Sequence, residues 1–265
     1  MSDDPRRTQP FCTPRCYRAC QCSRWPDMVD RWGNPVNHSG GGVVPVIPDW
    51  WLAGGIAAAD CIGAYRAIAT PGSAWGPGPA NLAASYINLA NPGTYDLTLG
   101  VAPAWAAATG WTFDGATTYL ITGIVAGGDA ATGGWTLIVQ YSGAVADKVL
   151  VGVHWAGVLD VGVRPMFGGG VIYQDNGSVI VAPALAAGNL AVSAGQGYRN
   201  GIANGANTVP LAGTCTFESY IGAGFDVPAG TLFLPSDATI QAVAFYQPAI
   251  TAAQVLAVAT AMAAL

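Results

Sequence analysis

The chain has 265 residues, of which 52% are apolar and only 9% are charged, whereas about a quarter of the residues in an ordinary globular protein are charged. The apolar fraction excludes a disordered chain, and the length allows one large domain or two small ones. The net charge of −5 disfavours nucleic-acid binding through a basic face.

Residues 1–57 differ from the rest of the chain and predict an extended, irregular arm. Six of the ten basic residues lie within residues 1–31, where no apolar stretch typical of a signal peptide occurs. The tryptophan, glycine and proline residues that follow show no helical or strand periodicity. Aromatic residues in such a segment usually pack on a surface, either the protein's own body or a neighbour. We expect the arm to fasten the protein to neighbouring subunits or to a protein lattice, and the alternative for its basic part is a solvated tail.

Four cysteines of the arm, with the spacing C-x3-C-x3-C-x-C, are its sharpest local feature: Cys12, Cys16, Cys20 and Cys22. Four thiolates fit a tetrahedral Zn²⁺ site, although zinc ribbons prefer two distant C-x2-C pairs. Disulfides are the second interpretation, within the arm, to Cys61 or between subunits, and free thiols in a reducing cell are the third. The sequence leaves these three open, and we expect Cys215 to be buried as an apolar residue.

From residue 58 onwards, short apolar runs bounded by Gly, Asn, Asp and Pro predict β-strands. Asp175-Asn176-Gly177 is a strong hairpin signal between two of them. In the segment 135–141 the odd-numbered residues are Trp, Leu, Val and Tyr, which predicts one large apolar face. The predicted strands are 61–68, 110–113, 117–121, 134–142, 148–154, 158–164, 170–174, 178–182, 189–194, 196–200, 208–213, 217–222, 230–234 and 239–247.

The C-terminus departs from this pattern and predicts a single helix. Thr251 and Gln254 have the spacing of a capping box, and Val258, Met262 and Leu265 follow on one apolar face. We expect no membrane-spanning helix, because the long uncharged stretches are interrupted by Gln and Pro.

Several catalytic signatures are absent from the sequence. Lys148, the only lysine, is followed by Val149, which excludes a phosphate-binding P-loop, and there is no Gly-x-Ser-x-Gly elbow and no zinc-protease helix motif. His154 has no identifiable serine partner, so we interpret it as an ordinary strand histidine.

Four segments, in matching order and spacing, resemble the concanavalin A-like, laminin-G-like jelly-roll domains found in phage virion and bacterial surface proteins. They are Trp111-Thr112-Phe113-Asp114-Gly115 with Tyr119-Leu120, then Tyr198-Arg199-Asn200-Gly201, then Ser219-Tyr220-Ile221-Gly222-Ala223-Gly224, and finally residues 238–246 with Ala249-Ile250-Thr251. The resemblance covers about residues 60–265. It implies two curved antiparallel sheets, and a range of functions from sugar binding and adhesion to virion decoration and glycoside hydrolysis.

The hydrolase branches of this family use a strand motif resembling Glu-x-Asp-x-Glu, which places two carboxylates on one face. Here Glu218 is the only glutamate of the chain, and residues 216 and 220 are not acidic. We therefore expect no enzymatic activity. The resemblance also implies Ca²⁺ on the rim of the sandwich, where Asp114, Asp129 and Asp226 lie in Gly-rich turns suited to oxygen ligation, although turn aspartates commonly cap their own backbone.

The sequence thus predicts an all-β, concanavalin A-like (laminin-G-like) antiparallel jelly-roll sandwich over 58–265, with an irregular arm over 1–57 and a short C-terminal helix. The expected function is that of a non-enzymatic structural or adhesion protein of a virion, as a capsid decoration or tail-associated component, or of an extracellular surface assembly. Such a protein would be made in the cytoplasm without a classical signal peptide and would form a homo-oligomer or part of a larger assembly, without binding nucleic acid or membrane. The alternative is a lectin-like carbohydrate-binding module assisted by Ca²⁺, and glycoside hydrolysis ranks last.

Overall fold

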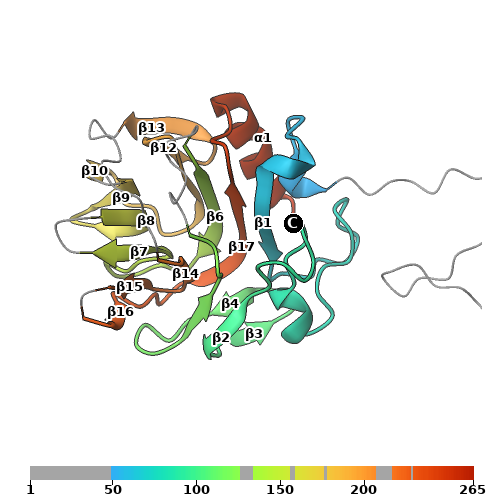
Figure 1. Cartoon of the computed structure of the whole chain (residues 1–265), viewed down its shortest axis with the longest axis horizontal. Coiled ribbons are helices and arrows are strands. Elements are labelled where there is room, and N and C mark those ends of the chain that lie inside the picture. Colours follow the sequence, from blue (N-terminus) through green and yellow to red (C-terminus); the bar gives the residue numbers. More distant parts are fainter. Residues whose placement is uncertain (1–48, 126–133, 156–158, 176–177, 207–216, 228) are drawn as a thin grey trace, which may run out of the picture. The chain divides into compact units, whose positions relative to one another are not determined.

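The computed structural model describes residues 49–125, 134–155, 159–175, 178–206, 217–227 and 229–265, and they form an antiparallel β-sandwich with one short C-terminal helix. Figure 1 shows the two sheets facing each other. The predicted all-β fold class is confirmed, and the architecture is compatible with a jelly roll. No helix in the described ranges combines the length and the apolarity that crossing a membrane requires.

The first sheet, called sheet 1 here, is built around β6 and β17, which pair along seven register positions. One edge of β17 pairs with both β1 and β4, so two segments share that edge. Among the described residues its strands are, in spatial order, β13 (Ile202–Ala206), β12 (Gln196–Arg199), β11 (Gly188–Ser193), β6 (Thr136–Ser142), β17 (Thr239–Tyr246), β4 (Gly110–Thr112) and β3 (Ala104–Ala106), with β1 (Cys61–Arg66) beside β17.

The second sheet, called sheet 2 here, carries a hairpin in addition to its main path. The hairpin strands β15 (Gly224–Asp226) and β16 (Thr231–Phe233) pair with each other, and β15 contacts β7 through Asp226 and His154. The main path among the described residues is β10 (Ser178–Val181), β9 (Gly170–Asp175), β8 (Leu159–Phe167), β7 (Val151–Trp155), β14 (Tyr220–Ile221), β5 (Tyr119–Ile121) and β2 (Thr98–Val101).

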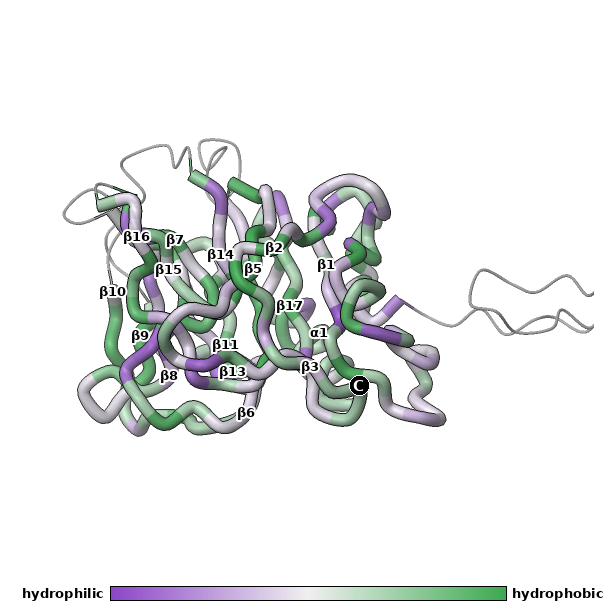
Figure 2. The backbone as a smooth tube through the Cα atoms, turned by 90° about the horizontal axis from the view of Figure 1, so that it is seen from below, coloured by the Kyte–Doolittle hydropathy of each residue, from purple (hydrophilic) through white to green (hydrophobic). Residues whose placement is uncertain are grey.

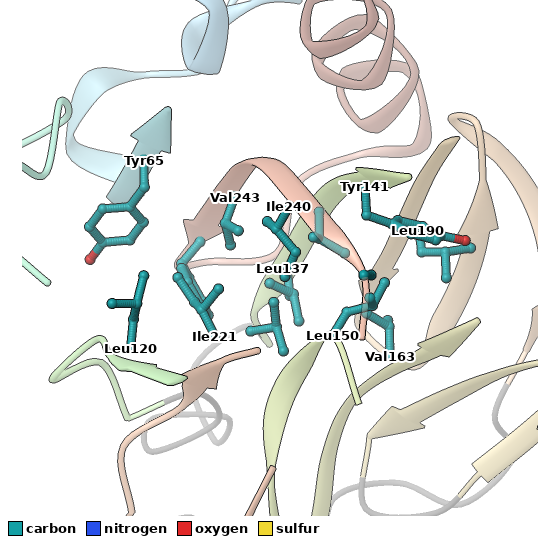
Figure 3. Packing of buried hydrophobic residues seen from close by; sticks show 14 of the residues in the cluster. Tyr65, Leu120, Leu137, Tyr141, Leu150, Val163, Leu190, Ile221, Ile240 and Val243 are labelled. Atoms are coloured by element: carbon teal, nitrogen blue, oxygen red, sulfur yellow. The ribbon is translucent and has the colours of Figure 1, made fainter. Parts of the chain in front are cut away.

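The main core lies between the two sheets, because alternate residues of each strand point toward the opposite sheet. On β6 these are Leu137, Val139 and Tyr141, and together with the buried Trp135 they confirm the predicted apolar face. Figure 3 shows side chains from both sheets meeting in this layer: Tyr65, Leu120, Leu137, Tyr141, Leu150, Val163, Leu190, Ile221, Ile240 and Val243.

A second apolar layer covers the outer face of sheet 1. Helix α1 (Ala252–Ala263) packs there with the 3-10 turn η1 (Trp50–Leu52). The predicted capping box is confirmed, since Thr251 accepts from the backbone of Gln254 and the Gln254 side chain accepts from the backbone of Thr251. The helix buries Val258 and Met262, as its periodicity predicts, and Leu265, which follows the end of the helix, is buried in the same layer.

The predicted arm reaches into this layer at its C-terminal end, because Trp50, Trp51 and Ile56 are buried against sheet 1 and α1. The boundary between residues 57 and 58 stays a prediction. The remaining short elements of the described chain are the 3-10 turns η2 (Ala58–Asp60) and η3 (Ala83–Tyr86).

Several predicted strand boundaries differ from the structure for local reasons. The strand predicted over 217–222 contains only Tyr220–Ile221 as β14, because the backbone at Gly222 turns into the left-handed region with φ of 84°. The strand predicted over 117–121 begins at Tyr119, because Asp114 holds residues 116–118 in a turn. The predicted strand 208–213 lies outside the described residues.

Candidate functional site

The cysteine cluster predicted as a zinc or disulfide site, Cys12, Cys16, Cys20 and Cys22, lies outside the described residues, as does Cys215. Cys61 lies at the start of β1, buried in the layer between sheet 1, η1 and α1. Its thiol donates to the carbonyl of Gly63, and burial raises the pKa of this thiol to about 12. Cys61 therefore behaves as an inert core residue rather than a reactive thiol.

The aspartates predicted as Ca²⁺ ligands do not meet in one described site. The carboxylate of Asp114 accepts hydrogen bonds from the backbone of Ala116, Thr117 and Thr118 and from both threonine hydroxyls. These bonds lower the pKa of Asp114 and use its carboxylate to close its own turn. Asp226 lies on β15, and Asp129 lies outside the described residues. Within the described ranges, no group of His, Cys, Asp and Glu has the arrangement of a metal site, and the Ca²⁺ and Zn²⁺ predictions stay predictions.

The tryptophans whose side chains the structure describes serve packing. Trp111 and Trp135 lie in the main core, and the indole of Trp111 donates to the hydroxyl of Ser85. Trp105 donates to the carbonyl of Ala67. Trp75, on a loop, packs partly against the outer layer of sheet 1. Among the described side chains, the candidate sugar-binding surface is therefore formed by other aromatic residues.

Such residues lie on the outer face of sheet 2, where three rings form a continuous row. The rings of Tyr119 and Tyr220 are stacked with 5.2 Å between centroids and 8° between planes. The ring of Phe225 follows, 4.9 Å from that of Tyr220 and tilted by 34°. We call Tyr119, Tyr220 and Phe225 the tyrosine row. Because these centroid separations are those of offset stacking, each ring covers only part of its neighbour's face.

The strand arrangement places this row. β14 pairs with β5 in a register that opposes Tyr220 to Ile121, so Tyr119 and Tyr220 are diagonal neighbours on one face. The chain then reverses at Gly222 and returns as β15, which brings Phe225 beside Tyr220. Figure 2 shows β15 and β16 beside β7 and β14, in agreement with Figure 1.

A glycine supports the first ring of the row. Gly100 on β2 lies directly under Tyr119, and a Cβ at this position would overlap the tyrosine ring. The missing side chain lets the ring lie flat against the edge of the sheet, which fixes the ring before any ligand arrives.

Polar groups that are not engaged within the protein accompany the row. Glu218 stands two residues before Tyr220 and on the same side of the chain. Phe217, which precedes Glu218, and Ser219, which lies between Glu218 and Tyr220, point inward. Burial raises the pKa of Tyr220, and the nearby Glu218 carboxylate and Tyr119 phenol raise it further. In the described chain, no hydrogen bond or ion pair engages the Glu218 carboxylate or the phenol groups of Tyr119 and Tyr220.

A second aromatic group continues the outer face beyond the row. His154 on β7 stacks on Phe233 of β16, with 3.8 Å between ring centroids and 11° between planes. The Arg164 guanidinium lies 4.5 Å from the centroid of Phe167 and 5.8 Å from that of Phe233. The same guanidinium donates to both carboxylate oxygens of Asp147 at 2.6 Å. Through these contacts with Phe233, the β15–β16 hairpin packs on sheet 2. His154, predicted as an ordinary strand histidine, is part of this group.

No protein-family model matches the chain, and no curated protein matches it in sequence. Among solved structures, a Trypanosoma rangeli sialidase in complex with 2,3-difluorosialic acid matches 82% of this chain with a TM-score of 0.51 and 17% identity. The same sialidase in complex with 2,3-difluoro-KDN has a TM-score of 0.52 at 14% identity. Domain 4 of AbnA, a GH43 extracellular arabinanase from Geobacillus stearothermophilus solved with arabinotriose, has a TM-score of 0.44 at 10% identity and 76% coverage of this chain. The chain spans only 35% of the length of the sialidase.

These matches correct the main functional prediction. The prediction of a non-enzymatic structural component of a virion or surface assembly was wrong, because the solved structures that share the fold with TM-scores of 0.51 and 0.52 are sialidases. The carbohydrate-binding alternative fits these neighbours better. The predicted partners of the arm and the predicted localisation stay predictions.

Proposed function

We propose that this chain is a non-catalytic carbohydrate-binding module, a jelly roll of the concanavalin A-like, laminin-G-like type, with the tyrosine row as its sugar platform. The observation that carries the proposal is the row itself: three half-buried or buried rings held side by side over β5, β14 and β15, with the unengaged Glu218 carboxylate next to them. Ligand sites in proteins combine aromatic surface with a few such polar groups.

The chemistry of this surface suits a sugar ring. One face of a pyranose presents C–H groups, whose partial positive charge is attracted to the negative face of an aromatic ring. The hydroxyls at the edge of the sugar donate hydrogen bonds, and an ionised carboxylate such as Glu218 is a strong acceptor for them. Tyr119 and Phe225 are half-buried and so keep ring surface for the first interaction, whereas Tyr220 is only 8% exposed and supports the two rings that lie against it.

The same residues argue against hydrolysis. A retaining or inverting glycosidase commonly needs two carboxyl groups across the scissile bond, and Glu218 has no acidic neighbour two residues away on its strand. A tyrosine nucleophile would need a phenol that loses its proton readily, whereas the pKa of Tyr220 is raised. We therefore expect no turnover of glycosides, with or without Glu218.

Replacing a ring of the platform tests the proposal. On a glycan array and in titration calorimetry with the best array hit, we expect Tyr119→Ala to weaken binding about tenfold or more, because a stacked aromatic contributes on the order of 1–2 kcal/mol. Leu256→Ala is the control, since Leu256 is an exposed apolar residue on α1 at the other face of the sandwich. An array without any hit for the wild-type chain, or equal affinity of the Tyr119→Ala variant, contradicts the proposal.

Gly100→Ala offers a second test that removes none of the three rings. The added methyl group would displace the Tyr119 ring from the edge of the sheet, so we expect sugar affinity to fall while near-UV circular dichroism reports a changed tyrosine environment. Gly72→Ala is the matched control, because a Cβ at Gly72 meets no atom within 4 Å and its positive φ imposes only a local backbone strain. Full affinity in Gly100→Ala would show that the position of Tyr119 is irrelevant to binding.

A further inference from the structure

We infer that the tyrosine row accepts neutral sugars and discriminates against glycans that carry a carboxylate. This inference rests on the proposed function and deepens it by naming the ligand class. The sialidase neighbours by themselves would suggest an acidic sugar, because those enzymes were solved with sialic acid or a derivative of it. The inference follows from the charges around the row.

A negative group flanks the row. Glu218 precedes Tyr220 in the segment leading into β14, on the same side of the chain as the Tyr220 ring, and its charge acts on the Tyr220 phenol. Asp226 directly follows Phe225 on β15, so the alternation of side chains along a strand directs it away from the face of Phe225. The Glu218 carboxylate has no ion-pair partner among the residues that the structure describes.

The lysine and arginine side chains of residues 49–265 have hydrogen-bond or ion-pair partners within the protein. Residues 49–265 contain four basic residues, Arg66, Lys148, Arg164 and Arg199. Arg164 is held by both oxygens of Asp147 and lies over two phenylalanine rings. Lys148 donates to the carbonyl of Gly115 at 3.3 Å, at the turn between β4 and β5.

The two remaining arginines are bound to backbone carbonyls. Arg66 is buried on β1 of sheet 1 and donates to the carbonyls of Ile68, Trp75 and Gly76. Arg199 on β12 donates to the carbonyl of Pro183. Among the residues that the structure describes, an acidic sugar on the tyrosine row would therefore meet the Glu218 carboxylate and no available guanidinium, the group best suited to bind a carboxylate.

A neutral sugar meets the Glu218 carboxylate favourably. An ionised carboxylate only accepts hydrogen bonds, and adjacent hydroxyls of a sugar supply the donors. A carboxylate on the ligand brings like charges together, and this repulsion is screened by salt. We expect each ligand carboxylate near the row to weaken binding about tenfold at low salt, a difference of about 1.4 kcal/mol.

The test compares array glycans in matched pairs that differ only by a terminal acidic sugar. For the full chain we expect the neutral member of each pair to bind at least about tenfold more tightly at low salt, and the preference to shrink in about 1 M salt, where the Debye length is about 3 Å. Equal or tighter binding of the acidic members overturns the inference and leaves the proposed function intact. An array with no hits overturns both.

Charge variants locate the source of the preference. Glu218→Gln keeps the size of the side chain and removes its charge, so we expect the ratio of neutral to acidic affinity to fall about tenfold in this variant. Asp60→Asn makes the same change of net charge next to β1 of sheet 1, and we expect it to leave the ratio unchanged. An equal fall in both variants would assign the preference to net charge alone and overturn the inference.

Discussion

Raising the pH above about 10 is expected to unfold the sandwich steeply. Burial raises the pKa of Tyr65, Tyr141, Tyr173 and Tyr246 above the ordinary value of 10, for Tyr173 to about 12, and it raises that of Cys61 from 9.0 to about 12. The unfolded chain loses these protons first, so the stability is complete below about pH 9 and falls as the pH rises toward the native pKa values. Each group contributes up to about 1.4 kcal/mol per pH unit, and the four tyrosines together about 5–6 kcal/mol per unit.

Urea unfolding followed by far-UV circular dichroism from pH 7 to 11 measures this loss. Tyr173→Phe is the informative variant, because it removes one titrating group whose hydroxyl donates a 3.3 Å bond to Asn204 and also interacts with the Arg199 side chain. We expect its stability to fall less steeply with pH, by up to about 1.4 kcal/mol per unit. A free energy of unfolding that is flat between pH 9 and 11 would refute the assignment of these phenols to the core.

Asn88→Ala is expected to cost about 3–5 kcal/mol of stability. The Asn88 side chain is fully buried and makes four hydrogen bonds to backbone groups. Its oxygen accepts from the N–H groups of Ala64 and Ala90, and its amide donates to the carbonyls of Ile62 and Thr94. The side chain thereby links β1 to the segment that leads into β2. Alanine would leave buried donors and acceptors without partners, at a cost of about 1–3 kcal/mol each.

The matched control is Asn81→Ala. Asn81 is exposed, and its side chain accepts one hydrogen bond from the backbone of Ala84 at 2.9 Å, so we expect a loss of about 1 kcal/mol or less. Chemical denaturation at neutral pH compares the two variants. Similar losses in both would mean that the four bonds of Asn88 contribute no more than the single bond of Asn81.

Local patterns in the sequence were sufficient for the elements whose stabilising contacts are local. The alternation from Trp135 to Tyr141 predicts β6 and its buried face, and the capping box at Thr251 predicts the start of α1. β2 and β3 were not predicted, because they are only four and three residues long and most of their residues, Leu99 and Val101 included, are exposed. Such strands exist because a neighbouring strand pairs with them, which a pattern along one segment does not reveal.

The candidate site escaped prediction for a related reason. Tyr119 and Tyr220 are separated by a hundred residues, and only the pairing of β5 with β14 brings their rings together. Trp111 and Trp135 are core residues, as the alternation around Trp135 predicts for the latter. Glu218 was singled out only because it lacks the second carboxylate of the hydrolase motif. A signal was available in the segment from Phe217 to Tyr220, whose alternation places Glu218 and Tyr220 on one outward face.

Because Cys61 is buried, the rate at which a thiol reagent labels it reports how often the outer layer opens. Its thiol lies under η1 and α1, so a reagent reaches it only when this layer separates from sheet 1. Peptide mapping by mass spectrometry distinguishes labelling at Cys61 from labelling at the other five cysteines. The rate at Cys61 then reports how often the C-terminal helix detaches, and a disulfide from the arm to this residue would have to wait for the same event.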